Sequence, residues 1–183
     1  MARSTFNKLA IVVLCSLCLC VWVYKASTRK HNYDLDVVIA WVNGTEELLE
    51  SYQRVTGQPI TQETRTRLRE YGMLRFALRS VALNAAFARR VFLVTNGQVP
   101  VWWNPDNEHA RIVRHEEIFV TKDLKGKTTP IPNALPTFNS NAIEACLRNI
   151  PGVAKYMLYL NDDMIITRPL SIEDFVNRRT GTL

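Results

Sequence analysis

Short runs of apolar residues, each closed by turn-forming residues, alternate along this chain with stretches of helical periodicity. The runs that we predict as buried strands are 36–41, 90–95, 111–114 and 156–160. Apolar residues in 67–87 recur at the spacing of one helix face, and acidic residues early in 45–55 favour a further helix there. Strands that alternate with helices in this way predict an α/β fold with a mainly parallel sheet.

Three segments between the predicted strands are candidates for binding. Asn141 and Glu144 have the spacing of a helix N-cap and its partner; the N–H groups of such a helix start can hold a phosphate, although capping alone explains the same residues. Residues 121–136 contain three prolines, a glycine and three lysines, and we predict a loop that acts as a lid. Arg75 and Arg79 share one helix face, which fits a solvated surface or contact with an anionic substrate.

The first 35 residues differ in character from the rest of the chain. Residues 9–24 are apolar apart from one serine and lack the small-residue pattern of a cleavage site, so we predict an N-terminal transmembrane signal anchor, with a cleaved signal peptide as the alternative. Residues 1–8 are then a tail, 25–35 a stem and 36–183 the α/β domain. A span this short suits a thin membrane such as that of the Golgi or ER. The flanking charges do not decide the orientation, but the position of the segment at the extreme N-terminus predicts a single-pass protein with a lumenal domain.

Charge and cysteine content narrow the possible partners. A formal net charge of +6 favours anionic partners such as phosphates and nucleotides. The basic residues are scattered without interleaved aromatic residues, so we do not expect a nucleic-acid partner. Cys146 is the only cysteine outside the apolar segment, and a disulfide framework in the domain is therefore excluded.

Two adjacent carboxylates, Asp162 and Asp163, follow the last predicted strand directly. Ligands of α/β sheets collect at the carboxyl ends of strands, and Mg²⁺ takes one or two carboxylates together with substrate phosphates. The pair is therefore a candidate site for Mg²⁺ or Mn²⁺. A plain chain turn over Asn161, Asp162 and Asp163 explains the same residues equally well.

Several familiar signatures are missing from the sequence. There is no glycine-rich dinucleotide or P-loop motif, no Cys/His cluster typical of zinc, and no Gly-x-Ser-x-Gly elbow. His115 stands beside Glu116 and Glu117 and is interpreted as an ordinary surface residue rather than a catalyst.

Five segments, in this order and spacing, resemble the Stealth family. They are Asp36–Thr45 (DVVIAWVNGT), Leu74–Val81 (LRFALRSV), Val94–Gln98 (VTNGQ), Leu135–Ser140 (LPTFNS) and Leu160–Met164 (LNDDM). The family includes the N-acetylglucosamine-1-phosphotransferase of lysosomal enzymes in animals and the capsular polysaccharide phosphotransferases of bacteria. The resemblance covers about residues 36–175 and corresponds to the first two conserved regions of the family; the third and fourth have no counterpart here.

This resemblance implies a Rossmann-like sheet and transfer of a hexose or N-acetylhexosamine 1-phosphate from a nucleoside-diphosphate sugar to a hydroxyl of a glycan or glycoprotein. Asp162 and Asp163 would be catalytic, either by holding the metal or by accepting the acceptor's proton. The residues expected to contact the substrate are Asn43, Gly44, Arg75, Arg79, Asn96, Gly97, Thr137, Asn139 and Ser140.

Two further functions fit the same residues. A metal-dependent glycosyltransferase would transfer the sugar itself with the same acid pair. A non-catalytic nucleotide-sugar-binding or regulatory subunit is the other alternative, because later conserved regions have no counterpart in these 183 residues. The chain is then expected to be the N-terminal part of a longer enzyme, or to act with a second copy or a complementing subunit.

Overall fold

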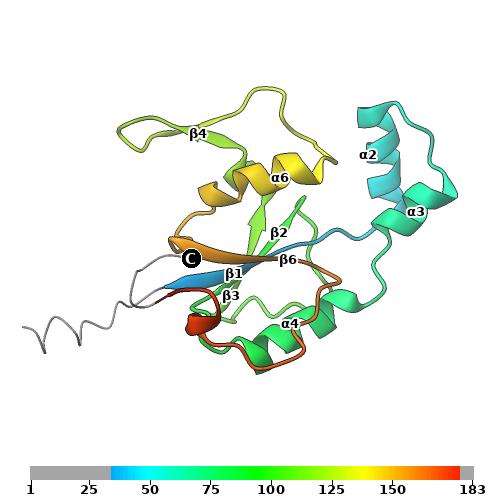
Figure 1. Ribbon diagram of the computed structural model, residues 1–183. Coiled ribbons are helices and arrows are strands. Elements are labelled where there is room, and N and C mark those ends of the chain that lie inside the picture. Colours follow the sequence, from blue (N-terminus) through cyan, green and yellow to red (C-terminus); the bar gives the residue numbers. More distant parts are fainter. Residues whose placement is uncertain (1–33, 178–183) are drawn as a thin grey trace, which may run out of the picture. The chain divides into compact units, whose positions relative to one another are not determined.

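A four-stranded parallel sheet forms the centre of the structure, a computed structural model that describes residues 34–177 (Figure 1). Its strands lie in the order β3-β2-β1-β6, and every neighbouring pair is parallel. The strands are β1 (Leu35–Ala40), β2 (Val91–Thr95), β3 (Ala110–Arg114) and β6 (Tyr156–Asn161). The four predicted strands and the mainly parallel α/β fold are therefore confirmed.

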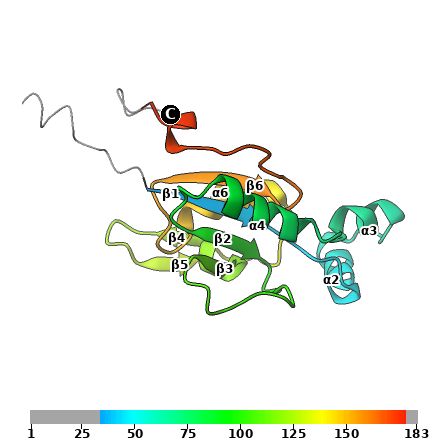
Figure 2. The same ribbon diagram turned by 90° about the horizontal axis from the view of Figure 1, so that it is seen from below.

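Helices cover both faces of this sheet. The helix α4 (Met73–Asn84) lies below the strands in Figure 1 and crosses in front of them in Figure 2, whereas α6 (Ser140–Cys146) lies on the opposite face. The remaining helical segments are α2 (Glu46–Thr56), α3 (Gln62–Leu68), α5 (His115–Ile118), and the 3₁₀ turns η1 (Leu147–Asn149) and η2 (Ile172–Asp174). Helices α2 and α3 lie beyond the carboxyl end of β1 (Figure 1).

Two of the helix predictions were wrong in their boundaries. The helical stretch predicted over 67–87 is broken, because α3 ends at Leu68 and α4 begins only after Gly72, whose φ of 82° is left-handed. The N-cap of α6 is Asn139 rather than Asn141: its side-chain oxygen accepts from the N–H groups of Asn141 and Ala142.

Part of the predicted loop 121–136 is a β-hairpin. Strands β4 (Val120–Lys122) and β5 (Thr128–Pro130) pair antiparallel, and the Asp123 carboxylate closes their turn by accepting from the N–H groups of Lys125 and Lys127. Pro130 fits at the end of β5 and Gly126 in the turn, whereas Pro132 and Pro136 follow the hairpin. After the hairpin, residues 131–136 contain no helix or strand.

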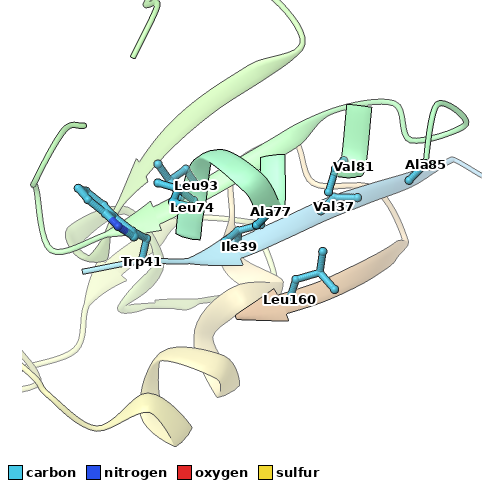
Figure 3. Close-up of a cluster of buried hydrophobic side chains, with 9 residues drawn as sticks. All are labelled: Val37, Ile39, Trp41, Leu74, Ala77, Val81, Ala85, Leu93 and Leu160. Carbon is cyan, nitrogen blue, oxygen red and sulfur yellow. The ribbon is translucent and has the colours of Figure 1, made fainter. Parts of the chain in front are cut away.

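Alternation of side chains along the strands supplies two cores, one on each face. On the α4 face, Val37 and Ile39 pack with Leu74, Ala77 and Val81 of the helix (Figure 3). On the α6 face, the intervening strand residues, such as Val38 and Phe92, pack with Leu147 and Ile150. The continuous apolar runs in the sequence thus reflect strands that are buried on both sides.

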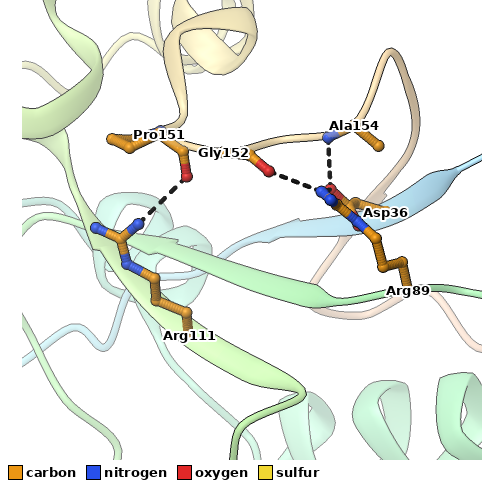
Figure 4. A network of polar contacts seen from close by, with 6 residues as sticks. All are labelled: Asp36, Arg89, Arg111, Pro151, Gly152 and Ala154. Carbon is orange, nitrogen blue, oxygen red and sulfur yellow. Dashed lines mark hydrogen bonds and ion pairs between the residues drawn. The ribbon is translucent and has the colours of Figure 1, made fainter.

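The amino ends of the strands are joined by a polar network of Asp36, Arg89, Gly152 and Ala154 (Figure 4). Asp36 in β1 is fully buried and accepts from Arg89 Nε at 3.0 Å, Arg89 Nη2 at 2.7 Å and the Ala154 N–H at 2.6 Å. Arg89 Nη2 also donates to the Gly152 carbonyl at 2.7 Å. This Asp36 network connects the segments that lead into β2 and β6 to β1, and so holds the amino-terminal ends of the three strands together.

The predicted tail (1–8), signal anchor (9–24) and most of the stem lie outside the described residues. Within residues 34–177, no helix is both long enough and apolar enough to span a membrane. The signal anchor therefore stays a prediction.

Candidate functional site

The strand order places a topological switch point between β1 and β6. The chain moves outward from β1 to β2 and β3 on one side, and then crosses back to place β6 on the other side of β1. In open parallel sheets, ligands bind in the crevice outside the carboxyl ends of the strands at such a point. The fold alone therefore predicts a site just after Ala40 and Asn161.

A cleft of about 630 Å³ lies at this position. Its floor includes Trp41 and Val42, which follow β1, together with Asn161 and Asp162 at the end of β6. Its walls come from α2 and α3 on one side, and from α5, the segment before α6 and α6 itself on the other. The wall residues include Leu48, Arg67, Leu68, His115, Thr137, Phe138 and Ser140.

The acid pair forms a turn, and one of its two carboxylates lines the cleft. The Met164 N–H donates to the Asn161 carbonyl at 3.1 Å, so Asp162 and Asp163 form the tip of a β-turn. Asp162 is half-buried and lines the cleft, whereas Asp163 is exposed and does not line it. The two interpretations of these residues from the sequence are thus compatible, and the turn presents one carboxylate to the cleft.

The surroundings of Asp162 disfavour its charge. The pKa of Asp162 is raised from 3.8 to about 6, mainly by burial and also by the negative charges of Asp163 and Glu70, while a backbone hydrogen bond opposes the shift. None of the ion pairs among the described residues involves Asp162. A bound cation would stabilise the ionised form of a carboxylate in this position.

Replacing Asp162 by asparagine should therefore stabilise the metal-free protein at neutral pH. The folded-state pKa lies above the ordinary value, so the ionised carboxylate weakens the fold increasingly from about pH 4 to pH 6 and fully above pH 6. We expect Asp162→Asn to gain on the order of 1 kcal/mol at pH 8, since partial exposure screens part of the penalty. Thermal unfolding from pH 4 to pH 8 measures the difference, which should vanish near pH 4. An equal gain from the exposed Asp106→Asn would contradict this cause.

Three of the predicted substrate contacts line the cleft. They are Asn96, which follows β2, Thr137, which precedes Phe138, and Ser140, the first residue of α6. Four others lie near the cleft but outside its lining, namely Asn43, Gly44, Gly97 and Asn139. The side chain of Asn139 caps α6, so the helix N–H groups expected to hold a phosphate already have a partner. The ligand contacts of all seven stay predictions.

Gln98 was missed in the sequence and organises the cleft rim. Its side-chain amide pairs with the backbone of Asn43: the Asn43 N–H donates to Oε1 at 2.9 Å, and Nε2 donates to the Asn43 carbonyl at 2.8 Å. The loops after β1 and β2 are thereby held together, which gives Asn43 a structural reason for its position.

Gly44 allows α3 to approach the end of β1. A Cβ atom at this position would stand 2.7 Å from the Leu68 carbonyl oxygen, closer than real contacts permit. Gly44 therefore fixes the base of the wall formed by α3, without itself lining the cleft.

Arg75 and Arg79 are not brought to the cleft. Both are exposed on α4; Arg75 stacks over Trp102 at 5.1 Å and Arg79 over Phe76 at 5.9 Å. These contacts agree with the solvated-surface interpretation of the two arginines. Substrate contact through them has no support from the cleft lining.

Two further cleft residues, His115 and Tyr159, were not recognised as candidates. His115 is buried rather than at the surface, so that interpretation was wrong; burial lowers the pKa of His115 and keeps the imidazole neutral at pH 7. Burial also raises the pKa of Tyr159 to about 12, with nearby Glu144 contributing, and its hydroxyl donates to Asn161 Oδ1 at 2.9 Å. The position of His115 directly after β3 was the signal that could have identified it.

The acid pair suits a divalent cation whose ligands come partly from the protein and partly from a bound substrate. Among residues 34–177, no group of three or more His, Cys, Asp and Glu side chains is placed to hold a metal ion. Mg²⁺, however, typically needs only one or two carboxylates when phosphates and water complete its shell. Asp162, half-buried and without a cationic partner, fits that requirement.

These features define a class of protein: an α/β domain with a ligand cleft at the switch point of a parallel sheet and a carboxylate at the strand end. Residues 67–183 match the family description Stealth protein CR2, conserved region 2. The chain belongs to the Stealth family.

Several relatives of the chain are bacterial proteins. It is 38% identical over 149 residues to the capsular polysaccharide phosphotransferase SacB of Neisseria meningitidis serogroup A, a match that covers 79% of this chain and 25% of that protein. It is 34% identical over 143 residues to the exopolysaccharide phosphotransferase cps2G of Lactiplantibacillus plantarum, covering 78% and 39%, and 37% identical over 146 residues to SCO6023 of Streptomyces coelicolor, covering 79% and 23%. The match thus spans about a quarter to two fifths of these relatives.

Proposed function

We propose that this chain carries the donor site of a sugar-phosphate transferase. The enzyme would move a hexose or N-acetylhexosamine 1-phosphate from a nucleoside-diphosphate sugar to a glycan hydroxyl, assisted by Mg²⁺ or Mn²⁺ at Asp162 and Asp163. The observation that carries the proposal is the cleft at the switch point, into which Asp162 projects without a cationic partner. Relatives named as capsular and exopolysaccharide phosphotransferases support the reaction class.

The reaction forms one P–O bond and breaks another. The acceptor hydroxyl attacks the phosphorus that bears the sugar, the pyrophosphate bond breaks, and the nucleoside monophosphate leaves with the bonding electron pair. A base removes the hydroxyl proton. A divalent cation bound here would neutralise charge on the diphosphate.

Different residues in and beside the cleft would perform these tasks. Above pH 6 Asp162 is ionised, and it then either ligates the metal or accepts the proton of the acceptor, with Asp163 in the other role. Tyr159 keeps its proton at neutral pH and donates it to Asn161 Oδ1, which orients the Asn161 side chain beside Asp162. The apolar side chains of Leu48, Leu68 and Phe138 pack together and would limit the access of water to the cleft.

The fate of the phosphorus tests the proposal. The full chain is incubated with UDP-N-acetylglucosamine or UDP-glucose, a glycan acceptor and Mg²⁺, and the products are followed by ³¹P NMR and mass spectrometry. We expect release of UMP and a phosphodiester on the acceptor. Release of UDP with no phosphorus on the product would instead identify a glycosyltransferase, and donor binding without turnover would identify a non-catalytic subunit.

The cellular setting belongs to the same proposal. Residues 9–24 would anchor the domain to the Golgi or ER membrane, facing the lumen, where glycan acceptors are found.

A further inference from the structure

The cleft is lined by two acidic side chains but by only one arginine and no lysine among the described residues. Its titratable lining residues are Arg67, His115, Glu116, Tyr159 and Asp162, and among the described residues Arg67 is the only arginine or lysine that lines it. His115 is neutral at pH 7 because burial lowers its pKa. An anionic ligand in this cleft therefore meets one permanent positive charge of the protein, on α3.

Arg67 takes part in no ion pair within the described part of the chain, whereas four other arginines do. Ion pairs there join Arg65 to Glu46, Arg89 to Asp36, Arg111 to Glu117 and Arg168 to Asp174. Arg67 instead lies over the ring of Tyr52 at 5.8 Å, with Nη2 3.5 Å from the Tyr52 hydroxyl oxygen. Most of its guanidinium donors are thus left for a ligand.

The side chain is held at the cleft by packing rather than by charge. Tyr52 meets Phe138 edge to face at 5.2 Å, and Phe138 is itself part of the cleft wall. The next residue, Leu68, is buried, and its backbone rests against Gly44 at the end of β1. The base of Arg67 is thereby fixed beside the floor of the cleft, while its head is exposed.

We infer that Arg67 binds the diphosphate of the nucleotide donor from the wall of the cleft formed by α3, an assignment that rests on the proposed function. A guanidinium binds phosphate oxygens through two parallel N–H groups and keeps its charge at every working pH. The acid pair at the end of β6 neutralises the diphosphate only through a metal, whereas Arg67 does so directly. Phosphoryl transfer depends on positioning and charge neutralisation, so both groups contribute to donor binding.

Arg65 provides a matched control on the same helix. It lies two residues away, pairs with Glu46 at 2.7 Å and does not line the cleft. The full chain is titrated calorimetrically with micromolar inorganic pyrophosphate in Mg²⁺, a probe that carries the diphosphate without a base or sugar. We expect Arg67→Gln to weaken binding about 10- to 100-fold, Arg67→Lys to weaken it less, and Arg65→Gln to change it by less than about twofold.

The outcomes separate this assignment from the proposed function. If the unaltered chain binds pyrophosphate and Arg67→Gln binds it equally well, the assignment is overturned and the donor site stands. If the unaltered chain does not bind pyrophosphate, the donor site and the assignment fall together. Thermal unfolding of the variants confirms that they fold, which the exposure of Arg67 and the helix propensity of glutamine favour.

Discussion

Replacing Arg89 with methionine is expected to lower the free energy of unfolding by about 3 kcal/mol, or the melting temperature by about 6 to 12 °C. Asp36 is fully buried, and Arg89 supplies two of its three hydrogen bonds. Removing the guanidinium leaves a buried carboxylate with only the N–H of Ala154. Chemical denaturation at pH 7 measures the loss.

Two further variants decide whether the loss arises from the uncompensated charge. Arg90→Met removes a neighbouring exposed arginine and should change stability by less than about 0.5 kcal/mol. Combining Arg89→Met with Asp36→Leu should recover much of the stability, because a buried ion pair exchanged for apolar groups is often neutral. A double variant no more stable than Arg89→Met would show that shape, not charge, governs this site.

Asp162→Asn is expected to abolish most of the metal-dependent binding of the nucleotide sugar, with a loss of at least about a hundredfold. Removing an outer partner of a metal site already costs about 10- to 100-fold, and a direct ligand contributes more. Asp163→Asn should have an effect in the same direction, but smaller if only Asp162 contacts the metal, since Asp163 lies outside the cleft lining. Calorimetric titration with UDP-N-acetylglucosamine, with and without Mg²⁺, measures both.

A surface carboxylate supplies the control for this experiment. Asp106→Asn removes an exposed acid that does not line the cleft, and it should bind the donor as the unaltered chain does. Unchanged Mg²⁺-dependent binding in both Asp162→Asn and Asp163→Asn would remove the metal site from the proposal. Because Asp162→Asn is expected to be more stable than the unaltered protein at pH 8, unfolding would not explain a loss of binding.

The strands and the acid pair were predictable because their signals are local. A buried parallel strand requires a continuous apolar run, and a turn after it requires residues such as Asn161 and Asp162. Helix limits were less predictable: apolar spacing in 67–87 ignores the left-handed backbone at Gly72, which separates α3 from α4. The cap of α6 at Asn139 likewise depends on backbone geometry that the pattern of residues does not specify.

The sequence by itself determined the α/β class, the four strands, the turn that carries the two aspartates and the resemblance to the Stealth family. Only the tertiary structure decided which carboxylate enters the cleft, that Arg67, His115 and Tyr159 join it there, and that Arg75 and Arg79 do not. The physical reason is that apolar periodicity depends on neighbours within one element. The lining of a cleft depends on the order of strands and on the packing of helices far apart in the chain.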